Sequence, residues 1–241
     1  MDDAVNLRIS NLVYRVAEQL SGWVFPPHCL VCAEPGVAER DLCAACDRSL
    51  PWQQGACLCC ALPLPVADTQ QVCGACRRRR PLLEQVYAAF LYASPVDGLL
   101  RRFKFHQELT AGRLLAALMA ERLAMVEQPQ ALVPVSLHPA RLRQRGYDQA
   151  LELAKPLART LELPLLQGLQ RQRTTAAQSE LDAAQRRRNL RGAFVARSGL
   201  PAHVALVDDV MTTGATLHAA ALALRRAGVQ RVDAWVCARV P

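Results

Sequence analysis

The chain is poor in lysine, in aromatic residues and in long apolar runs, and each scarcity limits what the protein can be. Only Lys104 and Lys155 are lysines among the 29 basic residues of this 241-residue chain, so its positive charge rests on arginine. Phe, Trp and Tyr make up 5% of the residues, which leaves few rings for stacking on nucleic acid bases. No uncharged apolar run is long enough to span a bilayer. We therefore exclude a membrane-spanning protein and expect a globular one.

The N-terminus lacks the basic region of a secretory signal. The first ten residues, MDDAVNLRIS, are acidic where such a signal would be basic. We expect a cytoplasmic protein, either free or bound peripherally at the inner face of the membrane, whose cysteines stay reduced. Apolar residues recur at helical spacing over residues 4–20, which predicts a separate amphipathic helix over residues 1–22.

The charge changes sign along the chain. Residues 1–76 contain four arginines and eight acids, a net charge of −4, and because the whole chain carries +8, the remaining residues carry +12. Strongly basic domains tend to bind phosphates or nucleic acid. We place a cysteine-rich module at residues 23–80 and a basic domain at residues 81–241.

Nine of the ten cysteines lie in the first third of the chain, and eight of them form four C-x-x-C pairs. The two residues inside each pair let both sulfurs face one ion, and two pairs complete the tetrahedral shell of a structural zinc ion. A disulfide cluster is disfavoured by the missing signal, and an iron–sulfur cluster by the spacing. The predicted ligands are Cys29, Cys32, Cys43, Cys46, Cys57, Cys60, Cys73 and Cys76.

The spacing leaves the pairing of these cysteines open. Sequential pairing, which we favour, gives two zinc ribbons, whereas alternate pairing gives a cross-braced site. Cys59 is the odd member of the group, and it either replaces a neighbour as ligand or plays no part. Saturated zinc sites of this kind are structural, because they leave no open position for catalysis.

Strand-like and helix-like segments alternate beyond residue 80. Such alternation predicts an α/β fold with a parallel sheet, right-handed crossovers and flanking helices. The expected strands are residues 85–92, 131–136, 204–207 and 232–240, and the expected helices are residues 95–104, 107–126, 147–161 and a last one that ends at Gly228.

The stretch after the third predicted strand is the most informative. Asp208 and Asp209 are followed by a Thr/Gly loop over residues 211–216 and then by the last helix. Free N–H groups and the helix dipole make such a turn a phosphate site, and Gly214 lets the backbone come close. No Walker A or G-x-G-x-x-G pattern is present, so the loop suits a monophosphate. A ribose diol, often with Mg²⁺, would separate the phosphate from the two acids, whereas helix capping explains only one of them.

The stretch resembles the phosphoribosyl pyrophosphate (PRPP) motif of type I phosphoribosyltransferases. The whole chain, over residues 29–239, resembles the ComF/GntX family, in which a double zinc module precedes a phosphoribosyltransferase domain. Three more segments carry the likeness. Residues 102–105 resemble the L-K-F element, VPVSLHPARLRQRGYDQA (133–150) resembles V-P-x-P-L-H-x-x-R-x-x-x-R-G-F-N-Q, and residues 171–194 resemble R-x-R-x-T-x-x-Q-x-x-L-x-x-x-x-R-x-x-N.

The resemblance implies a role for each matching residue. Asp208 and Asp209 would hold the ribose hydroxyls as catalytic residues, and PRPP would bring Mg²⁺ with it. Residues 171–189 would form a flap over the ligand, and Asp148, where the family pattern has Asn, adds a negative charge near the pyrophosphate. The implied substrate-binding residues are Thr212, Thr213, Gly214, Ala215 and Thr216 for the 5′-phosphate, Arg141, Arg145 and Gly146 for the pyrophosphate, and Arg171 and Arg173 in the flap.

Two kinds of function are implied by the resemblance. The first is an enzyme that transfers phosphoribose from PRPP to a base or amine. As a phosphoribosyltransferase of base or nucleotide salvage, it would have no role in handling DNA. The second is a binding protein of DNA uptake in natural transformation, or of DNA utilisation, that holds PRPP or a related ligand and binds single-stranded DNA. Proteins of the DNA-uptake machinery are then expected partners.

Overall fold

The computed structural model describes residues 27–37, 40–65, 71–172 and 192–241, and contacts divide the chain into two compact units, Met1–Leu50 and Pro51–Pro241. The helix predicted over residues 1–22 lies outside the described residues. In the first unit His28 and Pro35 form an antiparallel bridge, and the short helix α2 covers Ala44–Arg48. The division falls inside the predicted module of residues 23–80.

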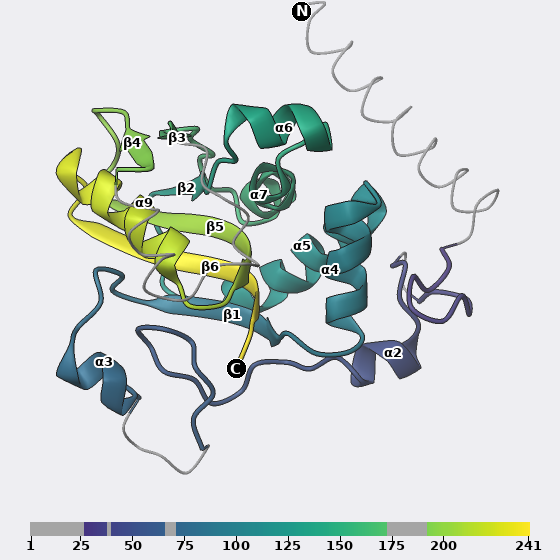
Figure 1. Ribbon diagram of the computed structural model, residues 1–241. Helices are drawn as coiled ribbons and strands as arrows, with labels where there is room; N and C mark the ends of the chain where they lie inside the picture. The colour runs from purple at the N-terminus through teal and green to yellow at the C-terminus, as the bar shows by residue number, and fades with distance from the viewer. Residues whose placement is uncertain (1–26, 38–39, 66–70, 173–191) are drawn as a thin grey trace, which may run out of the picture. The chain divides into compact units, whose positions relative to one another are not determined.

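The second unit is built on a four-stranded parallel sheet in the order β1-β6-β5-β2 (Figure 1). The strands are β1 (Val86–Leu91), β2 (Ala131–Pro134), β5 (His203–Met211) and β6 (Arg231–Arg239). All four predicted strands are therefore present, and the parallel α/β sheet is confirmed. The strands read as nearly continuous buried apolar runs because both faces of a parallel sheet are covered.

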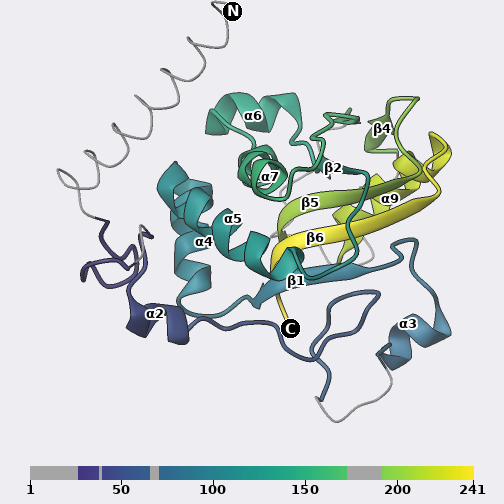
Figure 2. The same cartoon turned by 180° about the vertical axis from the view of Figure 1, so that it is seen from behind.

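Helices cover both faces of the sheet. Helices α5 (Leu109–Leu123) and α7 (Gln149–Thr160) pack on one face, α4 (Val96–Phe105) packs against α5, and α9 (Ala215–Arg226) covers the opposite face (Figures 1 and 2). These four helices match the predicted ones. The structure adds α6 (Pro139–Arg145) and a small antiparallel pair, β3 (Leu169–Arg171) with β4 (Phe194–Ala196).

The segment that carries the third C-x-x-C pair packs directly on the sheet. The rings of Trp52 and Phe90 lie 4.5 Å apart, and Arg239 Nε donates to the carbonyl oxygen of Cys60 at 2.9 Å. Ala61 is fully buried in the same apolar cluster as the core-facing residues of β5 and β6. The second half of the predicted zinc module is therefore part of the compact unit that contains the sheet.

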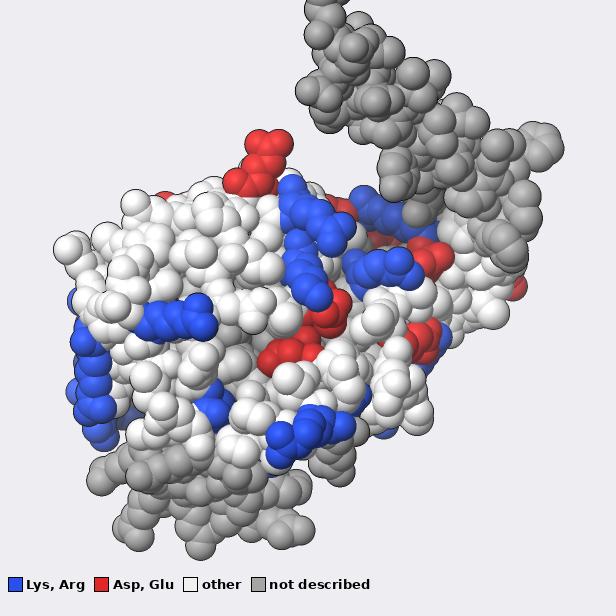
Figure 3. All heavy atoms as spheres, turned by 90° about the horizontal axis from the view of Figure 1, so that it is seen from above, with Lys and Arg blue, Asp and Glu red and all other residues white. Residues whose placement is uncertain are grey.

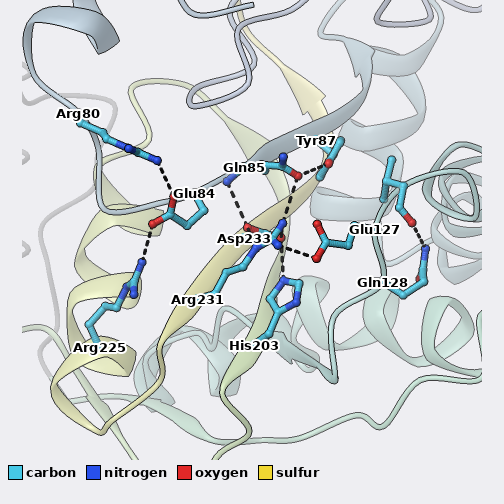
Figure 4. A network of polar contacts seen from close by, with 11 residues as sticks. Arg80, Glu84, Gln85, Tyr87, Glu127, Gln128, His203, Arg225, Arg231 and Asp233 are labelled. Atoms are coloured by element: carbon cyan, nitrogen blue, oxygen red, sulfur yellow. Dashed lines mark hydrogen bonds and ion pairs between the residues drawn. The ribbon is translucent and has the colours of Figure 1, made fainter.

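A polar network ties the strands together at their amino ends (Figure 4). The side chain of Asp233 is 1% exposed, and its carboxylate lies 2.8 Å from His203 Nε2 and 3.1 Å from the Arg231 guanidinium. The same carboxylate accepts the backbone N–H of Gln85 just before β1, at 3.2 Å. A buried carboxylate with three donors links β6 to both neighbouring strands, so this edge of the sheet has a structural role.

Candidate functional site

A cavity of about 130 Å³ lies at the carboxyl ends of β2 and β5, the opposite edge from the polar network. Parallel strands bring their carboxyl ends to one edge, where α/β proteins usually bind ligands. Gly146 ends α6 nearby with φ of 82°, and Arg173, with the rest of the predicted flap from residue 173, lies outside the described residues. Residues predicted for the site line the cavity: Arg141, Arg145, Arg171, Asp208, Asp209, Thr212, Thr213, Gly214, Ala215 and Thr216.

The Thr/Gly loop connects β5 to α9 as predicted. Gly214 adopts a left-handed φ of 74°, and a Cβ placed on it would lie 2.5 Å from Met211 Cε, so no other residue fits without strain. Thr213 Oγ1 accepts the N–H of Ala215 at 3.4 Å. The first turn of an α-helix has N–H groups without intrahelical acceptors and carries the positive end of the dipole. The loop is therefore suited to bind a phosphate.

The two carboxylates point to opposite faces of β5, because successive side chains of a strand alternate. Asp209 is buried, and its Oδ2 lies 2.7 Å from Lys104 Nζ at the end of α4. Its Oδ1 accepts the N–H of Val210 at 2.8 Å, while Asp208 Oδ1 accepts the N–H of Asp209 at 2.9 Å. Both carboxylates are thus oriented by hydrogen bonds at the base of the cavity.

Burial and mutual repulsion change the acidity of this group. Burial, together with the charge of Asp209, raises the pKa of Asp208 to about 8, against an opposing effect of Lys104. Burial lowers the pKa of Lys104, but the charge and hydrogen bond of Asp209 outweigh it, so the pKa of Lys104 is raised and the side chain stays positive. A carboxylate with a raised pKa is stabilised by hydrogen-bond donors, and the hydroxyls of a ribose are such donors.

Three guanidinium groups face the cavity from two elements. Arg141 and Arg145 lie on α6, the helix that comes after β2, and Arg171 ends β3. Arg171 is 7% exposed, and its guanidinium lies 5.4 Å from the centre of the Phe194 ring. Burial and the nearby charge of Arg141 lower the pKa of Arg171. An anion in the cavity would relieve this repulsion between like charges.

Asp148 has a different role from the one its charge suggests. Its Oδ1 accepts the N–H of Leu151 at 3.2 Å, which caps α7, and its Oδ2 accepts the N–H of Leu137 at 2.8 Å. The carboxylate thus ties the loop after β2 to the start of α7. Asparagine could accept only one of these bonds through its side-chain oxygen. Burial raises the pKa of Asp148.

Lys104 is a charged residue of the site for which the sequence analysis predicted no role. The sequence indicated it only through the likeness of residues 102–105 to a family element, because a lysine on a helix is usually a solvated surface charge.

The position of Lys104 also bears on the binding of Mg²⁺, which requires octahedral oxygen ligands at short distances. Both oxygens of Asp209 are already engaged, by Lys104 and by the N–H of Val210. A metal bound to Asp209 Oδ2 would therefore compete with Lys104 for that oxygen.

A larger groove of about 1010 Å³ adjoins the Thr/Gly loop, between α3 (Gly74–Arg78) and α9. This α3–α9 groove shares Met211, Thr213 and Ala215 with the smaller cavity. Its walls are mainly apolar, and none of the described residues that line it is acidic. Four of them are arginines: Arg79, Arg80, Arg226 and Arg239.

The eight predicted ligands form two groups of four sulfurs, each from two sequential C-x-x-C pairs, and in each group the sulfurs all lie within 4.8 Å of one another. Cys32 Sγ and Cys43 Sγ are 3.6 Å apart in the first group, and Cys60 Sγ and Cys73 Sγ are 3.8 Å apart in the second. Tetrahedral zinc with bonds of about 2.3 Å separates its sulfurs by about 3.8 Å. Sequential pairing is confirmed, both groups fit structural zinc, and Cys59 belongs to neither.

The thiols of each group differ in acidity. Burial raises the pKa of Cys29, but hydrogen bonds from backbone N–H groups outweigh it and bring the pKa down to about 6. Burial also raises the pKa of Cys73, but a backbone hydrogen bond and hydrogen bonds from the neighbouring thiols outweigh it and bring the pKa down to about 7. Burial and the thiol of Cys57 raise the pKa of Cys60 to about 11. Thiolates packed this closely repel one another, so four of them together require a bound cation.

Figure 3 shows the surface charge on one face of the molecule, where arginine and lysine side chains lie on several sides of a smaller group of acidic ones. This arrangement agrees with the net charge of +12 beyond residue 76. Fields of this kind attract anionic ligands.

Known proteins resemble the chain over most of its length. The double zinc ribbon domain matches residues 20–77. Competence protein F of Haemophilus influenzae is 35% identical over 217 residues, which cover 84% of this chain and 92% of that protein. The chain belongs to the ComF family. DNA utilization protein YhgH of Escherichia coli K12 is 32% identical over 225 residues, 89% of this chain and 97% of that protein.

Two further similarities are more distant. Competence protein ComFC of Streptococcus pneumoniae is 26% identical over 154 residues, 63% of this chain and 67% of that protein. The solved structure of the allosteric regulatory enzyme of purine biosynthesis matches 52% of this chain and 25% of that chain, with 22% identity and a TM-score of 0.36. Within the described part of this ComF-family chain, no helix has the length and apolar character needed to cross a membrane.

We predict that the two zinc sites contribute unequally to the stability of the sheet. The protein should contain about two zinc ions, and Cys32→Ser and Cys76→Ser should each reduce this to about one. Cys76→Ser should lower the melting temperature of the sheet unit by at least ~5 °C, on a scale of ~2–4 °C per kcal/mol, because its cluster packs on β1 and β6. Cys32→Ser should change it by less than about 2 °C. Elemental analysis and calorimetry check this; equal shifts, or zinc near zero, would contradict it.

We also predict that Asp208 lowers the stability of the free protein at neutral pH. Its pKa rises from an ordinary 3.8 to about 8 on folding, so the folded state binds the proton more tightly and its stability falls as the pH rises between these values. Asp208→Asn should therefore melt higher than the wild type, with a gain that grows from pH 5 to pH 8 to at least ~1 kcal/mol, or ~2–4 °C.

The control for this prediction is Asp97→Asn, which changes a carboxylate paired with Arg101 on the surface of α4. Its melting curve should match that of the wild type at each pH, since exposed pairs contribute little. If the melting temperatures of Asp208→Asn and the wild type differ by the same amount at every pH, Asp208 does not titrate as described.

Proposed function

We propose that this ComF-family protein binds PRPP, or a related phosphoribosyl ligand, in the cavity at the ends of β2 and β5. The observation that carries the proposal is the meeting of three groups in one cavity: the Thr/Gly loop, the acid pair and the arginines of α6 and β3. The 5′-phosphate would bind to the loop, the ribose hydroxyls would donate to Asp208 and Asp209, and Arg141 and Arg145 would bind the pyrophosphate.

The same arrangement supports transfer of phosphoribose to an acceptor. When pyrophosphate leaves, positive charge develops at the anomeric carbon of the ribose and negative charge on the departing oxygen. The guanidinium groups stabilise the negative charge, and the carboxylates under the ribose stabilise the positive one. No step requires a nucleophile from the protein, so Asp208 and Asp209 act by binding and by charge.

We propose in addition that the α3–α9 groove binds single-stranded DNA. The relatives are named for competence and for DNA utilisation, and the groove has apolar walls and no acid among its described residues. Of its four arginines, Arg79, Arg80 and Arg226 are available to a strand, because Arg239 is buried and donates to backbone carbonyl oxygens. Apolar surface contacts bases, and arginines contact phosphates. The groove begins at the Thr/Gly loop, so a strand end could reach the phosphoribosyl site. Proteins of the DNA-uptake machinery would then be partners.

A transferase of base or nucleotide salvage is the alternative. The phosphoribosyl cavity supports this function equally well, since it would need the same ligand and the same residues. DNA binding separates the two, because a salvage enzyme has no use for the arginine-lined groove.

The proposed ligand is tested by calorimetric titration with PRPP. The wild type should bind it, and Asp208→Asn should bind it about 10–100 times more weakly, because charged hydrogen bonds to the ribose are lost. Asp97→Asn serves as the control and should bind normally. Unchanged affinity in Asp208→Asn would contradict the assignment. Pyrophosphate release with a panel of bases and amines then decides between transferase and binding protein.

The DNA proposal is tested by fluorescence anisotropy with a labelled oligothymidylate between about 50 and 200 mM salt. Affinity should fall steeply with salt, and replacing Arg79 and Arg226 together by alanine should reduce the slope by about 1.4, since each phosphate contact contributes about 0.7. Arg101→Ala, outside the groove, should leave the slope as it is. Affinity that does not respond to salt would refute DNA binding through phosphate contacts.

A further inference from the structure

Lys104 occupies a place from which it can control the acid pair. It lies in the last turn of α4, with its Nζ 2.7 Å from Asp209 Oδ2, and the two side chains are only 28% and 9% exposed. The negative charge of Asp208 also helps to raise the pKa of Lys104. A partly buried, hydrogen-bonded ion pair is less screened by salt than a pair of exposed charges.

The packing of α4 fixes this position. Phe103, the preceding residue, is fully buried and packs so closely on α5 that a Cβ added to Gly112 would lie 2.4 Å from its ring. Its ring centre lies 5.7 Å from that of Tyr147, in the segment between α6 and α7. Because α4 is anchored on both sides of this ring, the lysine next to it in the chain is held toward the end of β5.

The charges around the cavity already favour an anion. Among the described residues that line it, four are cationic and three carry carboxylates. One of these carboxylates, that of Asp148, is engaged by two backbone N–H groups. The excess of positive charge therefore comes from side chains alone: Lys104, Arg141, Arg145 and Arg171 against Asp148, Asp208 and Asp209.

We propose that Lys104 is a positioning residue that supplies at Asp209 the positive charge a divalent cation would otherwise supply, so that a ribose 5-phosphate binds without Mg²⁺. A metal bound to Asp209 Oδ2 would compete for that oxygen with the Nζ of Lys104, and it would bring a second positive charge close to the lysine. Lys104 neutralises the charge at Asp209 Oδ2 and holds the carboxylate in a fixed position. The hydroxyls of the sugar can then donate hydrogen bonds to this carboxylate. This inference rests on the proposed phosphoribosyl ligand and adds how its sugar is recognised.

The experiment is a calorimetric titration of the full chain with ribose 5-phosphate, which lacks the pyrophosphate that binds Mg²⁺ by itself. The protein is desalted into buffer without magnesium and without a chelator, so that the zinc sites stay intact, and the titration is repeated with millimolar Mg²⁺. The wild type should bind with the same affinity, within about twofold, in both buffers.

Variants at the two lysines of the chain complete the test. Lys104→Met removes the charge and keeps the length, and it should weaken binding at least about tenfold without Mg²⁺, since a charged hydrogen bond is lost. Added Mg²⁺ should recover part of this affinity. Lys104→Arg should bind like the wild type in both buffers. Lys155→Met, on α7 beside Glu152, is the matched control and should change nothing.

The outcomes of this experiment separate the two proposals. If the wild type binds ribose 5-phosphate only when Mg²⁺ is present, the role of Lys104 is wrong while the phosphoribosyl site stands. If it binds in neither buffer, the inference fails, and the titration with PRPP decides whether the phosphoribosyl site fails with it. If Lys104→Met folds and binds like the wild type without Mg²⁺, Lys104 is not needed. If that variant does not fold, the comparison of wild type in the two buffers still decides.

Discussion

Parallel pairing of β5 with β2 on one side and β6 on the other is the constraint on which the site depends. The register pairs Val207 with Pro134 and with Trp235, so the strands end at a common edge. The segments that leave the strands must then gather at this edge: the Thr/Gly loop after β5 and the arginine-bearing α6 after β2. Asp208 and Asp209, near the end of β5, lie at the base of this edge. The cavity is a consequence of strand direction, and the side chains give it its chemistry.

The two edges of the sheet contrast in how their charges are arranged. At the amino ends, Asp233 is surrounded by donors from β5, from β6 and from the segment before β1, and this network fixes the strands. At the carboxyl ends, repulsion within the acid pair is only partly offset, since Lys104 neutralises Asp209 while the pKa of Asp208 is raised. Stability is concentrated at one edge, and a ligand is needed to complete the interactions at the other.

Much of this could be predicted from the sequence because the patterns were local. The strand with its two acids, the Thr/Gly loop and the next helix are contiguous, and the four C-x-x-C pairs need only short spacers. Helix α6 was not predicted because its arginine-rich turn has no apolar periodicity, and β3 and β4 because three residues are too few to show alternation. The role of Lys104 depends on contact between α4 and β5, which lie about 100 residues apart, and no local pattern reports such a contact. The same holds for the packing of Ala61 against the sheet.

The most direct test of the phosphoribosyl site is a crystal structure of the protein grown with PRPP. We expect the 5′-phosphate on the backbone of residues 212–216, the ribose hydroxyls within hydrogen-bond distance of Asp208 and Asp209, and Lys104 still paired with Asp209. PRPP bound elsewhere, for instance only in the α3–α9 groove, would contradict the phosphoribosyl site. A metal ion between Asp208 and Asp209, with Lys104 displaced, would contradict the role given to the lysine.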